Sequence, residues 1–281
     1  MRPSTRRSID LLVRTATRTA RQHQHQHRHF SQTRHSPSSV NPEEVSHFNA
    51  LASAWWEPHG SSRLLHLMNP LRHDFIQKCQ KTYGAAPVHE LRFLDIGCGG
   101  GIFAESAARL PSTKSVTAID PTPGVLAIAE AHKKCDPSLS NKLTYLNTSL
   151  EELPVGEMYD VVSVFEVIEH ITTPATFLDE VEKHVRPGGW LVMSTIARTW
   201  MSWFTTNLVA EDILGIVPKG THDWEKYINV DELEKYFATK GGWSKAVVQG
   251  VVYVPGVGWK EVEGSEKIGN YFLGVRKDTV A

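Results

Sequence analysis

LDIGCGGG, from Leu94 to Gly101, is the stretch of sequence that decides the fold. The letters LRFLDI (91–96) form a short apolar run that predicts a buried strand, and residues 102–110 predict a helix. A glycine loop between a strand and a helix lies at the carboxyl edge of a parallel sheet, where such folds bind ligands. Glycines there permit positive φ and let a ligand come close to the main chain. The stretch therefore predicts a cofactor site.

The spacing of the glycines separates two kinds of cofactor. A dinucleotide-binding loop has the pattern G-x-G-x-x-G. Counted from Gly97 the third glycine would fall at Ile102, and counted from Gly99 it would fall at Ala104. The loop is instead G-x-G-x-G, which lacks the spacing that seats a pyrophosphate. This spacing favours S-adenosylmethionine over a nicotinamide cofactor.

Two further polar positions support an adenosine ligand. Asp120 ends the next predicted strand, where an acid can accept both hydroxyls of a ribose. An acid there suits either cofactor, so only the spacing of the glycines distinguishes S-adenosylmethionine from a nicotinamide cofactor. Ser149 and Leu150, in LNTSLEELP (146–154), would lie beside the adenine. Gly97, Gly99, Asp120 and Ser149 are thus predicted to bind S-adenosylmethionine.

Strands and helices alternate from residue 91 to residue 196, which predicts a parallel sheet covered on both faces. The predicted strands are 91–96, 115–120, 142–147, 159–165 and 190–196, and the predicted helices are 102–110, 123–134 and 174–186. Two later strands, 244–254 and 270–277, have no helix between them, which predicts an antiparallel end. The expected fold is an α/β, seven-stranded, mostly parallel Rossmann-like sheet with an antiparallel last strand, as in class I S-adenosylmethionine-dependent methyltransferases.

The residues before the glycine loop predict an N-terminal helical segment, 41–85. Asn41 followed by Pro42 is typical of a helix start, and residues 43–56 carry an apolar helical face. A second helix is predicted over 70–83, opened by Pro70. Trp55 and Trp56 have two interpretations, a lid over the pocket or an anchor of the first helix to the core.

The charge of the chain is unevenly distributed. Residues 1–38 hold eight arginines and one acid, Asp10, which leaves 22 basic and 30 acidic residues, a charge of −8, in the remainder. That body repels a polyanion, so no nucleic-acid partner is expected. An arginine-rich, acid-poor leader predicts a mitochondrial transit peptide over residues 1–40. A disordered tail on a cytosolic protein is the alternative.

Acids and a histidine follow the predicted strand 159–165. FEVIEHI places Glu166, Glu169 and His170 at the ligand edge. Two carboxylates and an imidazole suit a divalent cation, with carboxylates favouring Mg²⁺ or Mn²⁺. Alternatively, His170 acts alone as a general base, or Glu166 only supports the loop or the cofactor. The spacing E-x-x-E-H leaves these three interpretations open.

Several longer stretches resemble the ubiquinone-biosynthesis O-methyltransferases, a family that methylates polyprenyl catechols. The resemblance runs from about Phe48 to the C-terminus. It rests on FNALASAWWEPHG (48–60), LHLMNPLR (65–72), LDIGCGGGIFAES (94–106), EVIEHI (166–171), RPGG (186–189), STIARTWMS (194–202) and VPKGTHDWEKYI (217–228). The glycine loop is shared by many methyltransferases, whereas the WW segment, NPLR and PKGTHDW are specific to this family.

The resemblance implies roles for individual residues. Arg72, Gly97, Asp120 and Phe165 match the family's cofactor-binding positions. Glu166, Glu169 and His170 match its metal-binding positions, which implies Mg²⁺ or another divalent cation beside S-adenosylmethionine. His170 and Glu166 would then be the catalytic residues, with His170 as a metal ligand or as the base.

The resemblance also implies substrates, partners and a location. The substrates would be 3,4-dihydroxy-5-polyprenylbenzoate and demethylubiquinol, and the partners other ubiquinone-biosynthesis proteins in a multi-subunit complex. The site of action would be the matrix side of the mitochondrial inner membrane. Within the methyltransferase domain, 41–281, the segment 198–228 is predicted to be a lid or a membrane-contacting insertion, because residues 200–217 carry an apolar helical stripe. An ordinary buried helix is the other interpretation of this stripe. The alternatives are methylation of another phenol or catechol, and a scaffold pseudoenzyme.

Overall fold

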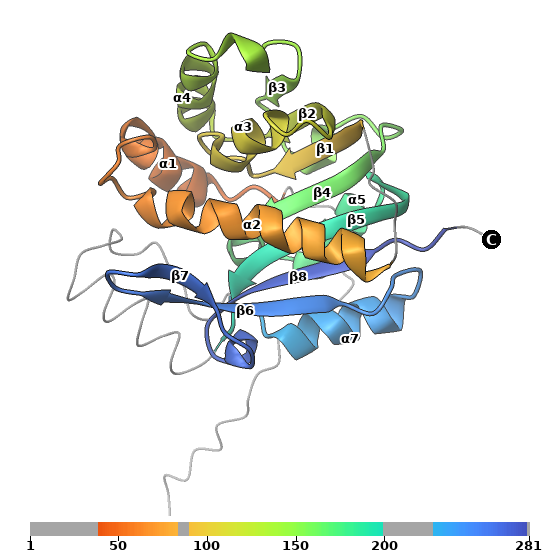
Figure 1. The fold of residues 1–281 in the computed structure, drawn as a ribbon. Helices are drawn as coiled ribbons and strands as arrows, with labels where there is room; N and C mark the ends of the chain where they lie inside the picture. Colours follow the sequence, from red (N-terminus) through yellow and green to blue (C-terminus); the bar gives the residue numbers. More distant parts are fainter. Residues whose placement is uncertain (1–38, 84–89, 199–226, 280–281) are drawn as a thin grey trace, which may run out of the picture.

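A single eight-stranded sheet organises the computed structural model, which describes residues 39–83, 90–198 and 227–279 (Figure 1). The strand order is β3-β2-β1-β4-β5-β8-β6-β7. The strands are β1 (Leu91–Ile96), β2 (Thr113–Ile119), β3 (Leu143–Leu146), β4 (Tyr159–Phe165), β5 (Val185–Ile196), β6 (Val247–Val254), β7 (Gly258–Glu261) and β8 (Asn270–Arg276).

The sheet is parallel from β3 to β5 and antiparallel beyond β5. β8 lies between β5 and β6 and pairs antiparallel with both. The α/β class, the mostly parallel sheet and the antiparallel last strand are therefore confirmed. The predicted count of seven strands is wrong by one, because β7 was not predicted. β7 has only four residues and turns back on β6 through a tight connection, with Val254 opposite Gly258.

Helices cover both faces of the sheet, and Figure 1 shows α2 crossing in front of the central strands. The helices are α1 (Pro42–Leu51), α2 (Arg63–Thr82), α3 (Ile102–Ala108), α4 (Pro123–Lys133), α5 (Pro174–Glu182) and α7 (Val230–Lys240). The apolar side chains of α2, α3 and α4 pack with one face of the sheet, and those of α5 and α7 pack with the other.

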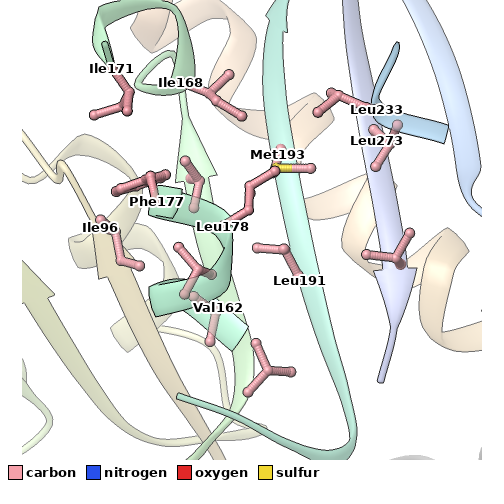
Figure 2. Packing of buried hydrophobic residues seen from close by; sticks show 14 of the residues in the cluster. Ile96, Val162, Ile168, Ile171, Phe177, Leu178, Leu191, Met193, Leu233 and Leu273 are labelled. Atoms are coloured by element: carbon pink, nitrogen blue, oxygen red, sulfur yellow. The ribbon is translucent and has the colours of Figure 1, made fainter. Parts of the chain in front are cut away.

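The two cores follow from the alternation of side chains along the central strands. In β4, Val161 packs with the helices of the first face, whereas Val162 and Val164 pack with those of the second. Figure 2 shows the second core, where Phe177 and Leu178 of α5 lie among strand side chains. A fully buried side chain of this size contributes about 1.5–3 kcal/mol, so these layers fix the strand ends that carry the site.

The second helix differs from its prediction. α2 begins at Arg63, seven residues before the expected start, and continues through Pro70. An internal proline removes a backbone hydrogen bond and costs about 3 kcal/mol. The buried side chains on either side of it, Met68 before and Phe75 and Ile76 after, keep the helix continuous by packing against the sheet. The prediction failed because it took Pro70 as a first helical residue.

The parallel strands end at one edge, and that edge positions the site. The carboxyl ends of β1, β2 and β4 bring together the glycine loop, Asp120 and the stretch 166–170. Among the residues that the structure describes, no helix is both long and apolar enough to cross a bilayer.

Candidate active site

A cavity of about 320 Å³ opens at this edge of the sheet. The ends of β1, β2 and β4 form its floor, and the segment 39–65 with part of α2 forms its roof. Every residue predicted at the sequence level to bind cofactor or metal is among those that line it: Arg72, Gly97, Gly99, Asp120, Ser149, Phe165, Glu166, Glu169 and His170.

The glycine loop is held in a conformation that only glycine adopts without strain. Gly97 and Gly99 have φ of +67° and +53°. A Cβ on Gly97 would lie 2.5 Å from Val167, and one on Gly99 would lie 2.3 Å from the ring of Trp55. The loop therefore presents bare backbone to the cavity for both conformational and steric reasons.

Asp120 joins the glycine loop to the start of α4. Its Oδ2 accepts the N–H of Gly99 at 2.9 Å, and its Oδ1 accepts the N–H of Thr122 at 2.8 Å. Burial raises the pKa of the carboxyl, and these two hydrogen bonds oppose that rise. Each carboxylate oxygen has a second lone pair. The side chain can thus order the loop and still accept hydroxyl groups of a ligand.

Arg72 places a buried positive charge in the wall of the cavity. Arg72 of α2 is 4% exposed, with its guanidinium carbon 4.8 Å from the centre of the Phe165 ring. Burial lowers the pKa of Arg72, while Glu166 first and then Asp95 oppose the shift. The buried Nε of Arg72 makes no protein hydrogen bond. Arg72 is therefore a positive group placed to meet an anionic ligand.

Asp95 lies under the loop, one residue from the end of β1. Ser163 Oγ donates to its Oδ1 at 2.6 Å. Burial raises its pKa to about 7, with the Ser163 hydrogen bond and Arg72 lowering it less strongly. Asp95 was not predicted as a site residue, although it stands inside the quoted loop motif. It lines the cavity next to Gly97.

The acid–histidine cluster begins with a strained residue. Glu166 follows β4 with φ of +55°, which is uncommon for a residue with a side chain, and its buried Oε1 has no protein hydrogen-bond partner. Glu169, in the 3₁₀ turn η4 (Ile168–His170), is 5% exposed and accepts from Thr195 Oγ1 at 3.0 Å. Burial, and then the charge of Glu166, raises the pKa of Glu169 to about 7.

His170 faces a partner that the sequence did not predict. Its Nδ1 lies 3.0 Å from Oε2 of Glu44, which comes from α1. Within residues 39–83, 90–198 and 227–279, no three His, Cys, Asp or Glu side chains are grouped so as to hold a metal ion. The three residues line one cavity, and the charges of Glu166 and His170 act on Glu169, while the role of the cluster as a metal site stays a prediction.

Both tryptophans of the N-terminal segment have a defined place. Trp55 is 8% exposed, lines the cavity and packs on the glycine loop. Trp56 stacks on His132 at 3.5 Å between ring centres and donates to the carbonyl of Gly100 at 2.9 Å. Trp55 therefore both lines the pocket and packs in an apolar cluster with Ile102, and Trp56 anchors the segment.

Ser149 also lies on the cavity wall. It precedes the 3₁₀ turn η3 (Leu150–Glu152), and its backbone N–H donates to Glu152 in a capping box. The predicted transit peptide, 1–40, and the predicted insertion, 198–228, fall almost wholly outside the described residues.

The sheet order, the G-x-G-x-G loop and the acid at the end of β2 define a class I S-adenosylmethionine-dependent methyltransferase. Comparison with known proteins agrees. A methyltransferase-domain family model matches residues 94–193. A solved plantazolicin methyltransferase in complex with SAH has the same fold, with a TM-score of 0.57 at 16% identity over 84% of this chain and 97% of that one.

Sequence comparison narrows the class to one family. The mitochondrial ubiquinone biosynthesis O-methyltransferase of Schizosaccharomyces pombe is 42% identical, over 88% of this chain and 89% of that protein. The protein of the same name from Candida albicans is 38% identical, over 85% of this chain and 86% of that protein. The chain belongs to the ubiquinone biosynthesis O-methyltransferase family.

Proposed function

We propose that the protein transfers a methyl group from S-adenosylmethionine to a phenolic oxygen of polyprenylated catechols, 3,4-dihydroxy-5-polyprenylbenzoate and demethylubiquinol, in ubiquinone biosynthesis. One observation carries the proposal. A single cavity is lined at one side by the glycine loop and Asp120, and at another by Glu166, Glu169 and His170. A methyl donor and an acid–histidine cluster suited to a catechol would therefore meet in one space.

The cofactor half of the cavity has a group for each part of S-adenosylmethionine. Asp120 would accept the ribose hydroxyls, and Ser149 would lie beside the adenine. Arg72 would bind the carboxylate of the methionine moiety, since its buried Nε has no protein hydrogen-bond partner and a guanidinium donates readily to a carboxylate. Phe165 lies under Arg72 and supplies shape through its ring.

The reaction needs a proton acceptor and alignment. A catechol hydroxyl loses its proton, the phenolate oxygen forms a bond to the methyl carbon, and the C–S bond breaks with its electron pair left on sulfur. The apolar cavity walls and Trp55 would exclude water and hold the methyl donor and the catechol in line. Because the sulfonium becomes a neutral thioether, charge disappears during transfer and a dry cavity favours the step.

The acid–histidine cluster fits a divalent cation in its chemistry. The buried Oε1 of Glu166 has no protein hydrogen-bond partner, and burial together with the charge of Glu166 raises the pKa of Glu169. A cation bound there would stabilise both carboxylates in addition to Arg72. Oxygen donors of this kind suit Mg²⁺ or Mn²⁺. Glu166, Glu169 and His170 would hold the ion, which would supply Lewis-acid stabilisation of the phenolate. Without an ion, His170 is the group that would take the proton.

The test is methyl transfer by the chelator-stripped protein, supplied with S-adenosylmethionine and a short-chain prenyl dihydroxybenzoate. We expect turnover to return at least 100-fold on adding Mg²⁺ or Mn²⁺, and Glu166→Gln to remove that response. Glu261→Gln, on the exposed edge strand β7, is the matched control and should respond as the unaltered protein does. Full turnover in chelator would end the metal role and leave His170 as the base. Cofactor binding without turnover under any ion would favour another acceptor or a scaffold role.

We further propose that the protein works at the matrix face of the mitochondrial inner membrane, beside other proteins of the pathway. The leader 1–40 has the composition of a transit peptide, and a polyprenyl substrate resides in a bilayer. The stripe formed by Trp200, Trp203, Phe204 and Leu208 is the segment expected to touch lipid. Deleting 200–217 should cut co-sedimentation with liposomes at least fivefold. An unchanged bound fraction would refute this contact.

A further inference from the structure

The cavity roof reaches the acid–histidine cluster through one side chain. Glu44, on the first turn of α1, places Oε2 3.0 Å from Nδ1 of His170, across 126 residues of sequence. Both side chains are mostly buried, with 22% and 19% of their surfaces exposed. Phe48, one helical turn further on, meets the His170 ring edge-on at 5.3 Å between ring centres. Two residues of α1 thus contact the same imidazole.

The partner of Nδ1 decides which nitrogen of a neutral imidazole carries the proton. A deprotonated carboxylate only accepts hydrogen bonds, so a neutral imidazole paired with a deprotonated Glu44 has its proton on Nδ1 and its lone pair on Nε2. The edge-on ring of Phe48 also limits rotation of the imidazole. Glu44 therefore selects a tautomer, and Phe48 restricts the orientation of the ring.

We propose that Glu44 is a positioning residue, which holds His170 in the Nδ1–H tautomer and presents the Nε2 lone pair for the reaction. The proposal rests on the methyl transfer proposed above for this site. It holds for either role of His170, because an imidazole uses the same lone pair to take a proton or to ligate an ion. A histidine that ligates a metal commonly donates its other N–H to a carboxylate in this way.

The packing of Phe48 against Trp55 and contacts at both ends of α1 hold Glu44 in position. α1 has no fully buried residue. Before the helix, the N–H of Ser39 donates to Glu151 Oε1 at 3.0 Å, and near its end Asn49 Oδ1 accepts the N–H of Gly124 at 2.9 Å. These contacts tie α1 to the first turn of α4 and tie the residues before α1 to η3. The N-terminal segment thus completes the site by supplying a residue that acts through His170.

The experiment reads the tautomer directly, in the full chain labelled with ¹⁵N-histidine. His170 is assigned as the signal missing from His170→Gln, and spectra are taken above about pH 8, where an ordinary imidazole is neutral. The unaltered protein should show a protonated Nδ1 and an unprotonated Nε2. Glu44→Ala should move the ring toward the Nε2–H tautomer and lower kcat about tenfold, the lower end of the effect of such supporting partners.

Two variants separate positioning from support of the helix. Glu44→Gln keeps an acceptor oxygen, so it should retain most of the Nδ1–H signal and lose less activity than Glu44→Ala. Glu43→Gln removes the same charge from the same turn at an exposed position and should match the unaltered protein. The dissociation constant of S-adenosylmethionine, measured by calorimetry, should stay within about twofold in all three.

The NMR and activity measurements test the positioning role of Glu44 separately from the proposed methyl transfer. Unchanged ¹⁵N shifts in Glu44→Ala overturn it. So does a loss of activity that comes wholly from weaker cofactor binding, because that marks a structural role of α1. If the tautomer responds to Glu44→Ala while the unaltered protein methylates no catechol, that result would support the positioning role of Glu44 and contradict the proposed substrate.

Discussion

Gly99→Ala is expected to lower the melting temperature by about 8 °C and to weaken binding of S-adenosylmethionine at least tenfold. The left-handed conformation, with φ of +53°, costs a residue with a Cβ about 1–2 kcal/mol. The new methyl would lie 2.3 Å from the Trp55 ring, and overpacking of this kind costs about 1–3 kcal/mol. A loss of about 3 kcal/mol corresponds to such a thermal shift in a domain of this size.

The affinity should fall because either response to the clash damages the cofactor wall. If Trp55 moves, the cavity loses its cover, and if the loop moves, the hydrogen bond from Gly99 to Asp120 is lost. Thermal unfolding and calorimetry measure the two effects. Gly256→Ala is the control, since it has positive φ but open space around its Cβ, and should leave cofactor binding unchanged. In a Trp55→Ala background, Gly99→Ala should cost less, and an equal cost there would mean that the ring is not the obstacle.

The parts of the fold predicted from sequence are those encoded by local patterns. The glycine loop and Asp120 stand at the ends of apolar strands, so their meeting at one edge follows from the rule for parallel sheets. β7 escaped prediction because a four-residue strand has too few residues to show alternation, and its pairing depends on β6. The start of α2 at Arg63 was not predicted, because Pro70 was taken as the first helical residue and proline is a strong local signal for a helix start. Packing of buried residues outweighed that signal.

The parts of the site that the sequence did not predict depend on contacts between distant residues. Nothing near Glu44 in the sequence indicates that it meets His170, because the contact requires α1 to fold over the loop after β4. Trp55 was predicted as either lid or anchor, and only the folded structure shows that it lines the cavity and also packs in an apolar cluster. The charge environment of Asp95 likewise depends on its depth, because an acid in the same motif but nearer the surface would keep an ordinary pKa.

The free energy of unfolding of the cofactor-free protein is expected to fall from pH 5 to pH 8, and Asp95→Asn should remove the part of that fall that comes from Asp95. Burial raises the pKa of Asp95 to about 7, whereas an aspartate in the unfolded chain titrates near 3.9. The folded state therefore keeps a proton that the unfolded chain releases. The contribution of this proton to the free energy of unfolding is complete below about pH 4 and is lost as the pH rises through about 7. The total loss is on the order of 4 kcal/mol.

Urea unfolding of both proteins at several pH values measures the difference. Asn keeps a carbonyl oxygen to accept from Ser163 and does not titrate, so its stability relative to the unaltered protein should rise by roughly 3 kcal/mol from pH 5 to pH 8. Glu169, whose pKa is also raised to about 7, makes the free energy of unfolding fall with pH by the same amount in both proteins. Its contribution therefore cancels from the difference between them. Ser163→Ala should raise the pKa of Asp95 further, because the Ser163 hydroxyl favours the charged carboxylate. The pH at which the free energy of unfolding falls should therefore be higher in this variant. Parallel curves for the unaltered protein and Asp95→Asn would show that the buried carboxyl is ionised throughout, with Arg72 compensating its charge.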